Sequence, residues 1–167
     1  MHKRWGFDMD TLRDIVSYLC LTYPHKSELS LARLTKMVYL ADWKTAINQE
    51  RQLTNIAWYF NHYGPYVDDV ENIIVADNEF NIRNTTTPYG TKKNLVEAKA
   101  TASYEISDNV KTVLDEVIEK SSKLYWNDFI RLVYSTYPIR TQPRYSNLDL
   151  PSLAAKYKAF ERSSSHM

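Results

Sequence analysis

The sequence has few of the features that build disulfide frameworks or membrane spans. It contains one cysteine, Cys20, which excludes an intramolecular disulfide and favours a reducing compartment. No window approaches the roughly 18 consecutive apolar residues of a membrane span. The N-terminal segment MHKRWGFDMD also lacks the apolar stretch of a signal peptide. We therefore expect a soluble, cytoplasmic protein with no membrane partner.

The sequence also has few glycines and a net charge close to zero. Three glycines in 167 residues leave little material for the phosphate-binding loops of nucleotide enzymes. With 21 basic and 20 acidic side chains, the formal net charge is +1, which disfavours a dedicated nucleic-acid-binding protein. Basic and aromatic residues do alternate between Lys123 and Tyr145, a pattern that could stack on RNA or DNA. A solvated face or a wet protein interface is the simpler interpretation.

Residues for catalysis or metal binding are sparse. Only His25 and His62 are internal histidines, and neither lies in a His-Glu-x-x-His or Cys-x-x-Cys pattern. Cys20 falls on an apolar helical stripe, where a thiol is poorly reactive. The acids Asp68 and Asp69 are typical of a first helical turn. We expect no catalytic residue, no metal and no cofactor.

The spacing of apolar residues predicts a mainly α-helical domain of about six to seven helices, with a small β-hairpin insertion around residues 80–100. The expected helices run from near Asp10 to Pro24, from Ser27 or Ser30 to about Ile47, from Thr54 to Gly64, from Val67 to Ile74, from Ser107 to Ile118, from Trp126 to Pro138, and from Asp149 onward. Residues 140–149 should form a loop. The length suits a single domain over residues 1–162, in which 141–162 form a C-terminal loop and helix. Residues 163–167 are expected to be disordered or to derive from expression of the protein.

The stretch from Leu29 to Val70 organises the rest of the chain. Its first helix has apolar residues on one face and carries Lys-x-x-Tyr-x-x-Asp at residues 36–42. Its second part, NIAWYFNHYGPYVDDV, crowds aromatic rings around Gly64-Pro65, a pair expected to end one helix and begin another. The chain has 13 tyrosines, and tyrosine is favoured at recognition surfaces.

The motifs in this stretch carry a resemblance to a known family. Lys-x-x-Tyr-x-x-Asp is followed by an aromatic residue, Trp58, and then by Tyr-Gly-Pro at 63–65 and Val67. A weaker match is a long helix before a short one that closes on Ser135-x-x-Pro138. Together they resemble the Panacea domain of SocA-like antitoxins over roughly residues 10–140.

The resemblance implies an antitoxin that neutralises a cognate protein toxin, encoded by a neighbouring gene, through direct contact and without catalysis. It also implies that the protein could deliver its toxin to a cytoplasmic protease. Within the matching motifs, we expect the partner-binding residues to be Lys36, Tyr39, Asp42, Trp58, Tyr59, His62, Tyr63, Gly64, Pro65 and Tyr66. For Tyr39 and Asp42 an architectural role is the stronger expectation, and for Lys36 a contact role.

Three alternatives stay open from the sequence alone. The protein could be an adaptor of phage or prophage origin that uses the same surface without a toxin. It could be a hydrolase that uses His62 with Asp68 or Asp69. It could also be a winged-helix protein whose hairpin contacts DNA, an activity that the near-neutral charge disfavours.

Overall fold

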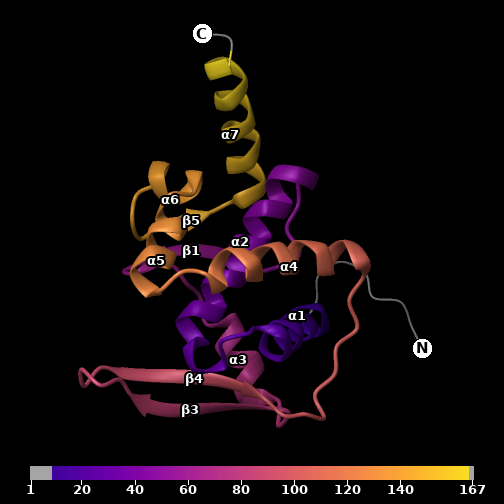
Figure 1. Ribbon diagram of the computed structural model, residues 1–167. Helices are drawn as coiled ribbons and strands as arrows, with labels where there is room; N and C mark the ends of the chain where they lie inside the picture. The colour runs from indigo at the N-terminus through magenta and orange to yellow at the C-terminus, as the bar shows by residue number, and fades with distance from the viewer. Residues whose placement is uncertain (1–8, 166–167) are drawn as a thin grey trace.

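The computed structural model describes residues 9–165 and is mainly helical, as the sequence predicts (Figure 1). Seven α-helices, two short sheets and one 3-10 turn are present in these residues. The helices are α1 Met9–Thr22, α2 Leu31–Gln49, α3 Asp69–Ala76, α4 Asp108–Ser122, α5 Trp126–Tyr134, α6 Tyr137–Thr141 and α7 Leu150–Ser165. None of them combines the length and the apolar character needed to cross a bilayer.

Helix α2 is the central element. It contacts α1, α3, α4, α7 and the hairpin strand β4, and it is buried along most of its length. The hydroxyl of Ser30 caps the helix by accepting the backbone N–H of Arg33 at 3.1 Å, so Ser30, and not Ser27, is the cap of the two that the sequence allows. Ser107 caps α4 in the same way through the N–H of Val110. These caps determine where the two helices begin.

The core draws on every large segment of the described chain. Buried apolar side chains of α1, α2, α4, α5 and α7 form one cluster, which also includes strand residues of both sheets. Its largest fully buried members include Trp58, Tyr23, Tyr39 and Phe129. Helix α7 packs its first half against α2 through Leu153 and then projects away from the body (Figure 1).

The predicted β-hairpin is present between residues 80 and 98. Strands β3 Phe80–Thr86 and β4 Lys92–Ala98 pair antiparallel, with Phe80 opposite Ala98 and Thr86 opposite Lys92. Burial at the base of the hairpin, at Leu95 and Val96, ties it to the start of α2. The backbone N–H of Val96 donates to the carbonyl of Leu29 at 3.0 Å. This contact meets the requirement that a lone hairpin be supported by the helices.

The prediction of a helix from Thr54 to Gly64 is wrong. This segment instead forms strand β1 Trp58–Asn61, which lies between β2 Gly64–Pro65 and β5 Asn147–Leu148 in a three-stranded antiparallel sheet. The residues of β1 alternate between buried and more exposed, the period of a strand. Gly64-Pro65 therefore does not separate two helices.

Three further boundaries differ from the sequence predictions. Pro138 does not close α5, which ends at Tyr134; it lies in the first turn of α6, where the missing N–H of proline costs no hydrogen bond. Residues 140–149 are not a simple loop, because they contain the end of α6 and strand β5. At the C-terminus, residues 163–165 continue α7, and residues 166–167 lie outside the described residues.

Candidate functional site

Asp42 lies inside the protein and anchors the loop between α2 and β1. One carboxylate oxygen accepts the backbone N–H groups of Leu53 at 2.8 Å and Thr54 at 3.0 Å. The other accepts the Thr54 hydroxyl at 2.5 Å and the Trp58 indole N–H at 2.8 Å. Burial raises the pKa of Asp42 to about 6, against the opposing effect of these hydrogen bonds. The side chain has no exposed surface, so its role here is to position the entry into β1.

Tyr39 and Trp58 form the buried support beneath β1. Their rings meet edge to face, with centroids 5.5 Å apart and an interplanar angle of 81°. The Tyr39 hydroxyl shares a hydrogen bond of 2.8 Å with the Thr136 hydroxyl, which links α2 to the turn between α5 and α6. Burial raises the pKa of Tyr39 above its usual range. Both rings are almost completely enclosed, so they hold the strand from below.

Lys36 is a buried cation without an acidic partner among the described residues. Lys36 is 2% exposed, and no salt bridge joins it to a carboxylate in the described part of the chain. The ammonium lies 5.4 Å from the centroid of the Tyr66 ring, a cation–π distance. Burial lowers the pKa of Lys36 to about 8. Burial therefore disfavours the charged form of Lys36, whose ammonium lies next to the Tyr66 ring.

The β1–β2 turn presents the exposed part of the predicted site. His62 and Tyr63 occupy the turn between Asn61 and Gly64, and Tyr63 is 76% exposed. The two rings contact each other edge to face at 4.5 Å. Tyr59 lies on the same hairpin and is half-buried. The turn therefore offers aromatic rings to solvent on a short, hydrogen-bonded hairpin.

Tyr145 completes this surface, although the sequence analysis did not place it in the site. It is 56% exposed, and its hydroxyl shares a hydrogen bond of 2.9 Å with Nδ1 of His62. The two rings stack at 6.5 Å with an angle of 21°. Its backbone φ of +68° is strained for a non-glycine residue. The N–H of Tyr145 donates to the Phe60 carbonyl, so strand pairing holds the residue in this conformation. We call Tyr59, His62, Tyr63, Tyr66 and Tyr145 the turn surface.

Gly64 is required by the geometry of the turn. Its φ is +105°, and a Cβ placed on it would lie 3.3 Å from the Tyr134 ring and 3.6 Å from Lys36. Residues other than glycine rarely adopt this conformation, and the Tyr134 ring would have to shift by a few tenths of an ångström to accommodate a Cβ. Gly64 and the buried Pro65 thus shape the turn without presenting side chains to a partner.

We predict that Gly64→Ala lowers the free energy of unfolding by about 2–3 kcal/mol, because strain and a steric contact add together. Gly90→Ala is the matched control: Gly90 also has a positive φ, +82°, but nothing lies within 4 Å of the added Cβ. It should cost only about 1 kcal/mol. Urea denaturation of both variants measures the difference, and equal losses would contradict a steric role for Tyr134.

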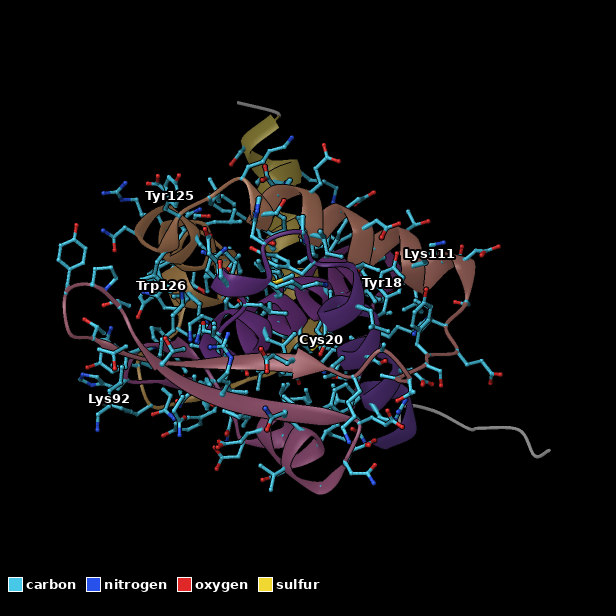
Figure 2. The ribbon with its side chains drawn as sticks, turned by 60° about the horizontal axis from the view of Figure 1, so that its bottom comes forward. Tyr18, Cys20, Lys92, Lys111, Tyr125 and Trp126 are labelled. Carbon is cyan, nitrogen blue, oxygen red and sulfur yellow. The ribbon has the colours of Figure 1, made fainter. Side chains whose placement is uncertain are left out.

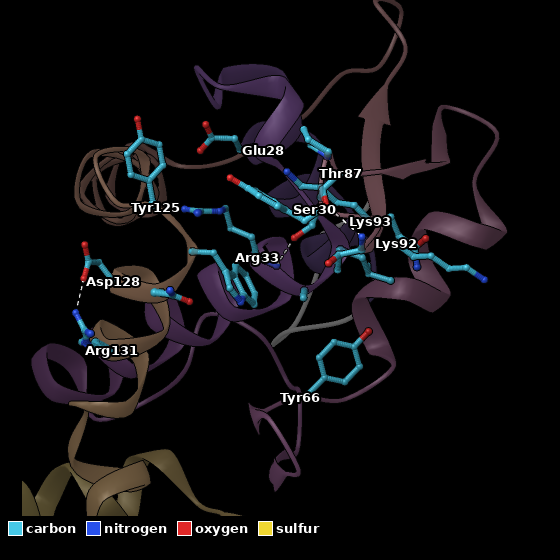
Figure 3. Close-up of a pocket in the computed structure, with 18 residues that line it drawn as sticks. Glu28, Ser30, Arg33, Tyr66, Thr87, Lys92, Lys93, Tyr125, Asp128 and Arg131 are labelled. Atoms are coloured by element: carbon cyan, nitrogen blue, oxygen red, sulfur yellow. Dashed lines mark hydrogen bonds and ion pairs between the residues drawn. The ribbon is translucent and has the colours of Figure 1, made fainter.

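A groove adjoins the turn surface at Tyr66. It lies between the tip of the β3–β4 hairpin and the start of α5, with the first turn of α2 as its floor (Figure 3). Its volume is about 1150 Å³, and it is open to solvent. Its walls carry three tyrosines, one tryptophan, four basic and two acidic residues: Tyr66, Tyr89, Tyr125, Trp126, Arg33, Lys92, Lys93, Arg131, Glu28 and Asp128. We call this feature the hairpin groove.

The structure thus divides the ten predicted site residues. Tyr59, His62, Tyr63 and Tyr66 reach the surface, whereas Lys36, Tyr39, Asp42, Trp58, Gly64 and Pro65 are buried beneath them. The His62 ring forms its hydrogen bond with Tyr145, and the two carboxylates considered for a hydrolase lie at the start of α3, Asp68 as its N-cap and Asp69 as its first residue. In residues 9–165, no three His, Cys, Asp or Glu side chains are grouped as metal ligands.

Comparison with known proteins gives one family. The family described as antitoxin SocA-like, Panacea domain, matches residues 34–138, which is more than half of the chain. The match begins within α2, includes the turn and the β3–β4 hairpin, and ends in α6. Neither the curated proteins nor the solved structures contain a match. The chain belongs to the SocA-like antitoxin family and carries its Panacea domain.

Proposed function

We propose that this protein is an antitoxin that neutralises a cognate protein toxin by direct, non-catalytic binding, and that the toxin contacts the turn surface. Family membership supports the antitoxin role. The observation that favours this surface is the set of exposed aromatic rings held in fixed positions around His62. Tyrosines of this kind supply large contact areas at low entropic cost.

Pre-organisation is the physical argument for the turn surface as a binding site. The rings of His62, Tyr63 and Tyr145 hold one another by stacking, edge contact and a hydrogen bond. Less side-chain freedom is then lost when a partner binds, which favours affinity. A strained backbone at an exposed tyrosine is also typical of functional positions.

The buried residues of the motif contribute indirectly. Asp42 and Trp58 set the position of β1, and Gly64 sets the shape of the turn. We propose that Tyr39, Asp42, Trp58, Gly64 and Pro65 act on binding through the shape of the turn surface. Lys36 acts on binding through Tyr66, because its ammonium contacts the Tyr66 ring.

Co-expression tests the proposal. The product of the neighbouring gene should arrest growth when produced alone, and the antitoxin should restore growth and co-purify with it. A stable complex would favour neutralisation by occlusion, whereas toxin loss that depends on a cytoplasmic protease would favour delivery for degradation. Failure to restore growth together with failure to co-purify would refute the proposal.

We predict that Tyr63→Ala weakens toxin binding at least about thirtyfold, as expected for a central aromatic contact. The free energy of unfolding should change by less than about 0.5 kcal/mol, because the ring is largely exposed. Phe160→Ala is the control, since Phe160 is 52% exposed on the projecting part of α7. Isothermal titration calorimetry measures both affinities. Equal affinities in the two variants would exclude Tyr63 from the interface.

A further inference from the structure

The floor of the hairpin groove contains a buried guanidinium that forms no ion pair with a carboxylate of the described residues. Arg33 is 2% exposed and lines the groove. Its guanidinium donates to three neutral oxygens: the Tyr23 hydroxyl at 3.1 Å, the Ser121 carbonyl at 3.0 Å and the Leu124 carbonyl at 3.1 Å. Its Nε–H has no hydrogen-bond partner within residues 9–165. A buried charge without a counter-ion is costly, and it raises the electrostatic potential of the groove above it.

The walls reinforce this positive potential. Lys92 and Lys93 lie on the hairpin side, and Arg131 lies on the α5 side (Figure 3). Of the two acids in the groove, Asp128 is engaged by Arg131 in an ion pair of 2.7 Å. The groove thus retains an excess of positive charge in a protein whose net charge is only +1.

Aromatic rings give the groove its apolar surface. Tyr125 is 79% exposed and Trp126 is 42% exposed, so both rings offer apolar area to solvent at the start of α5. The guanidinium of Arg33 lies 4.6 Å from the Phe129 ring centroid and 5.9 Å from that of Trp126, which fixes the floor against α5. Tyr66 connects the groove to the turn surface.

Size and shape indicate a polypeptide occupant. The volume of about 1150 Å³ lies just above the upper end of the roughly 300–1,000 Å³ typical of small-molecule pockets, and the site does not enclose its contents. The site is also open to solvent, with residues of the hairpin on one side and residues at the start of α5 on the other (Figure 3). Glu28 at its rim and the near-neutral net charge favour a segment with a few acidic side chains over a polyanionic nucleic acid.

We propose that the hairpin groove binds an extended segment of the partner protein that carries acidic side chains next to aromatic or aliphatic ones. The acidic groups pair with Lys92 and Lys93 within the positive potential of the buried Arg33, and the apolar groups pack on Tyr125 and Trp126. This inference rests on the proposed antitoxin function and adds a second contact region, continuous with the turn surface through Tyr66.

A library of random twelve-residue peptides displayed on phage, selected on the full chain, tests the groove without a known toxin. The selected peptides should combine Asp or Glu with aromatic or aliphatic residues. Lys92→Glu/Lys93→Glu should weaken their binding about tenfold or more at low salt, and Tyr125→Ala about tenfold. The affinities are measured by fluorescence anisotropy with synthetic copies of the selected peptides.

Matched controls separate the groove from general effects of charge and ring loss. Lys99→Glu/Lys111→Glu makes the same charge change at exposed positions away from the groove, and Lys111 lies at the opposite side of the molecule from Lys92 (Figure 2). Phe160→Ala removes an exposed ring outside the groove. Both controls should bind the peptides within twofold of the wild type.

Three results would overturn the groove proposal: selected peptides without acidic residues, groove variants that bind like the wild type, or tighter binding of a (dT)20 oligonucleotide than of any peptide. The co-expressed toxin gives an independent reading. If the wild type binds no toxin, the proposed function fails. If it binds a toxin whose affinity is unchanged in the groove variants, only the groove proposal fails.

Discussion

A chain in which Trp58 is replaced with alanine should lose about 4 kcal/mol of its free energy of unfolding. Three losses combine at this position. A large ring that is 1% exposed leaves a cavity in the core. The edge-to-face contact with Tyr39 disappears. The Asp42 carboxylate also loses the indole N–H that donates to it at 2.8 Å. A domain of ordinary stability, about 5–15 kcal/mol, would lose a large part of its total.

Trp58→Phe is the control that separates packing from hydrogen bonding. It keeps most of the ring volume but removes the indole N–H, and we expect a loss of about 1–2 kcal/mol. Chemical denaturation followed by circular dichroism measures both variants. If Trp58→Ala and Tyr63→Ala had equally small effects on stability, the division of the motif into a buried support and an exposed contact surface would be wrong.

The helices could be predicted from local signals because those signals are strong. Ser30 and Ser107 both precede amphipathic runs, and both hydroxyls cap the helices that follow. The hairpin could be predicted because period-2 segments flank a turn-rich centre, and β3 and β4 pair over residues 80–98. In each case the residues that determine the element lie within it.

The segment around β1 could not be assigned correctly for the opposite reason. Its strand conformation depends on pairing with β5, whose Leu148 lies opposite Trp58 and is far away in the sequence. Thr54, the expected helix cap, instead donates its hydroxyl to Asp42. With many aromatic residues in a short run, the sequence pattern fits a helix as well as a strand, and distant partners decide between them.

The candidate site could be predicted from the sequence only in part, for the same reason. Tyr59, His62, Tyr63 and Tyr66 could be selected because they surround one motif, and they reach the surface. Tyr145 could not, since its contact with His62 joins residues 83 positions apart. The aromatic and basic residues near the start of α5 were visible in the sequence, but only the fold brings them opposite Lys92 and Lys93.

Lys36→Met should stabilise the protein by about 2 kcal/mol at pH 7. The wild-type side chain is a buried cation with no acidic partner among the described residues, and burial lowers its pKa to about 8 from an ordinary value near 10.5. Each unit of difference corresponds to about 1.4 kcal/mol of preference for the neutral form. Methionine fills a similar volume without a charge, and the lost contact with the Tyr66 ring offsets part of the gain.

The pH dependence identifies the cause of this stabilisation. Between pH 8 and 10.5 the unfolded chain keeps the Lys36 proton while the folded chain releases it, so wild-type stability should rise with pH in this window. Lys36→Met lacks that rise, and its advantage over the wild type should narrow by about 1 kcal/mol between pH 7 and pH 9. Urea titrations at the two values measure it. Lys156→Met, at an exposed position on α7, should match the wild-type curve.

The change in toxin affinity caused by Lys36→Met then tests whether Lys36 has a role in binding. A residue that lowers stability at neutral pH is expected to be kept for function, because packing alone would favour methionine. We expect Lys36→Met to bind the toxin more weakly although it is more stable, since the ammonium behind Tyr66 positions a ring shared by the turn surface and the hairpin groove. A variant that gains stability and keeps full affinity would remove Lys36 from the binding mechanism. If Lys36→Met instead lowered the free energy of unfolding, the Lys36 ammonium would have to be solvated or paired in the folded protein. Its burial would then not destabilise the fold.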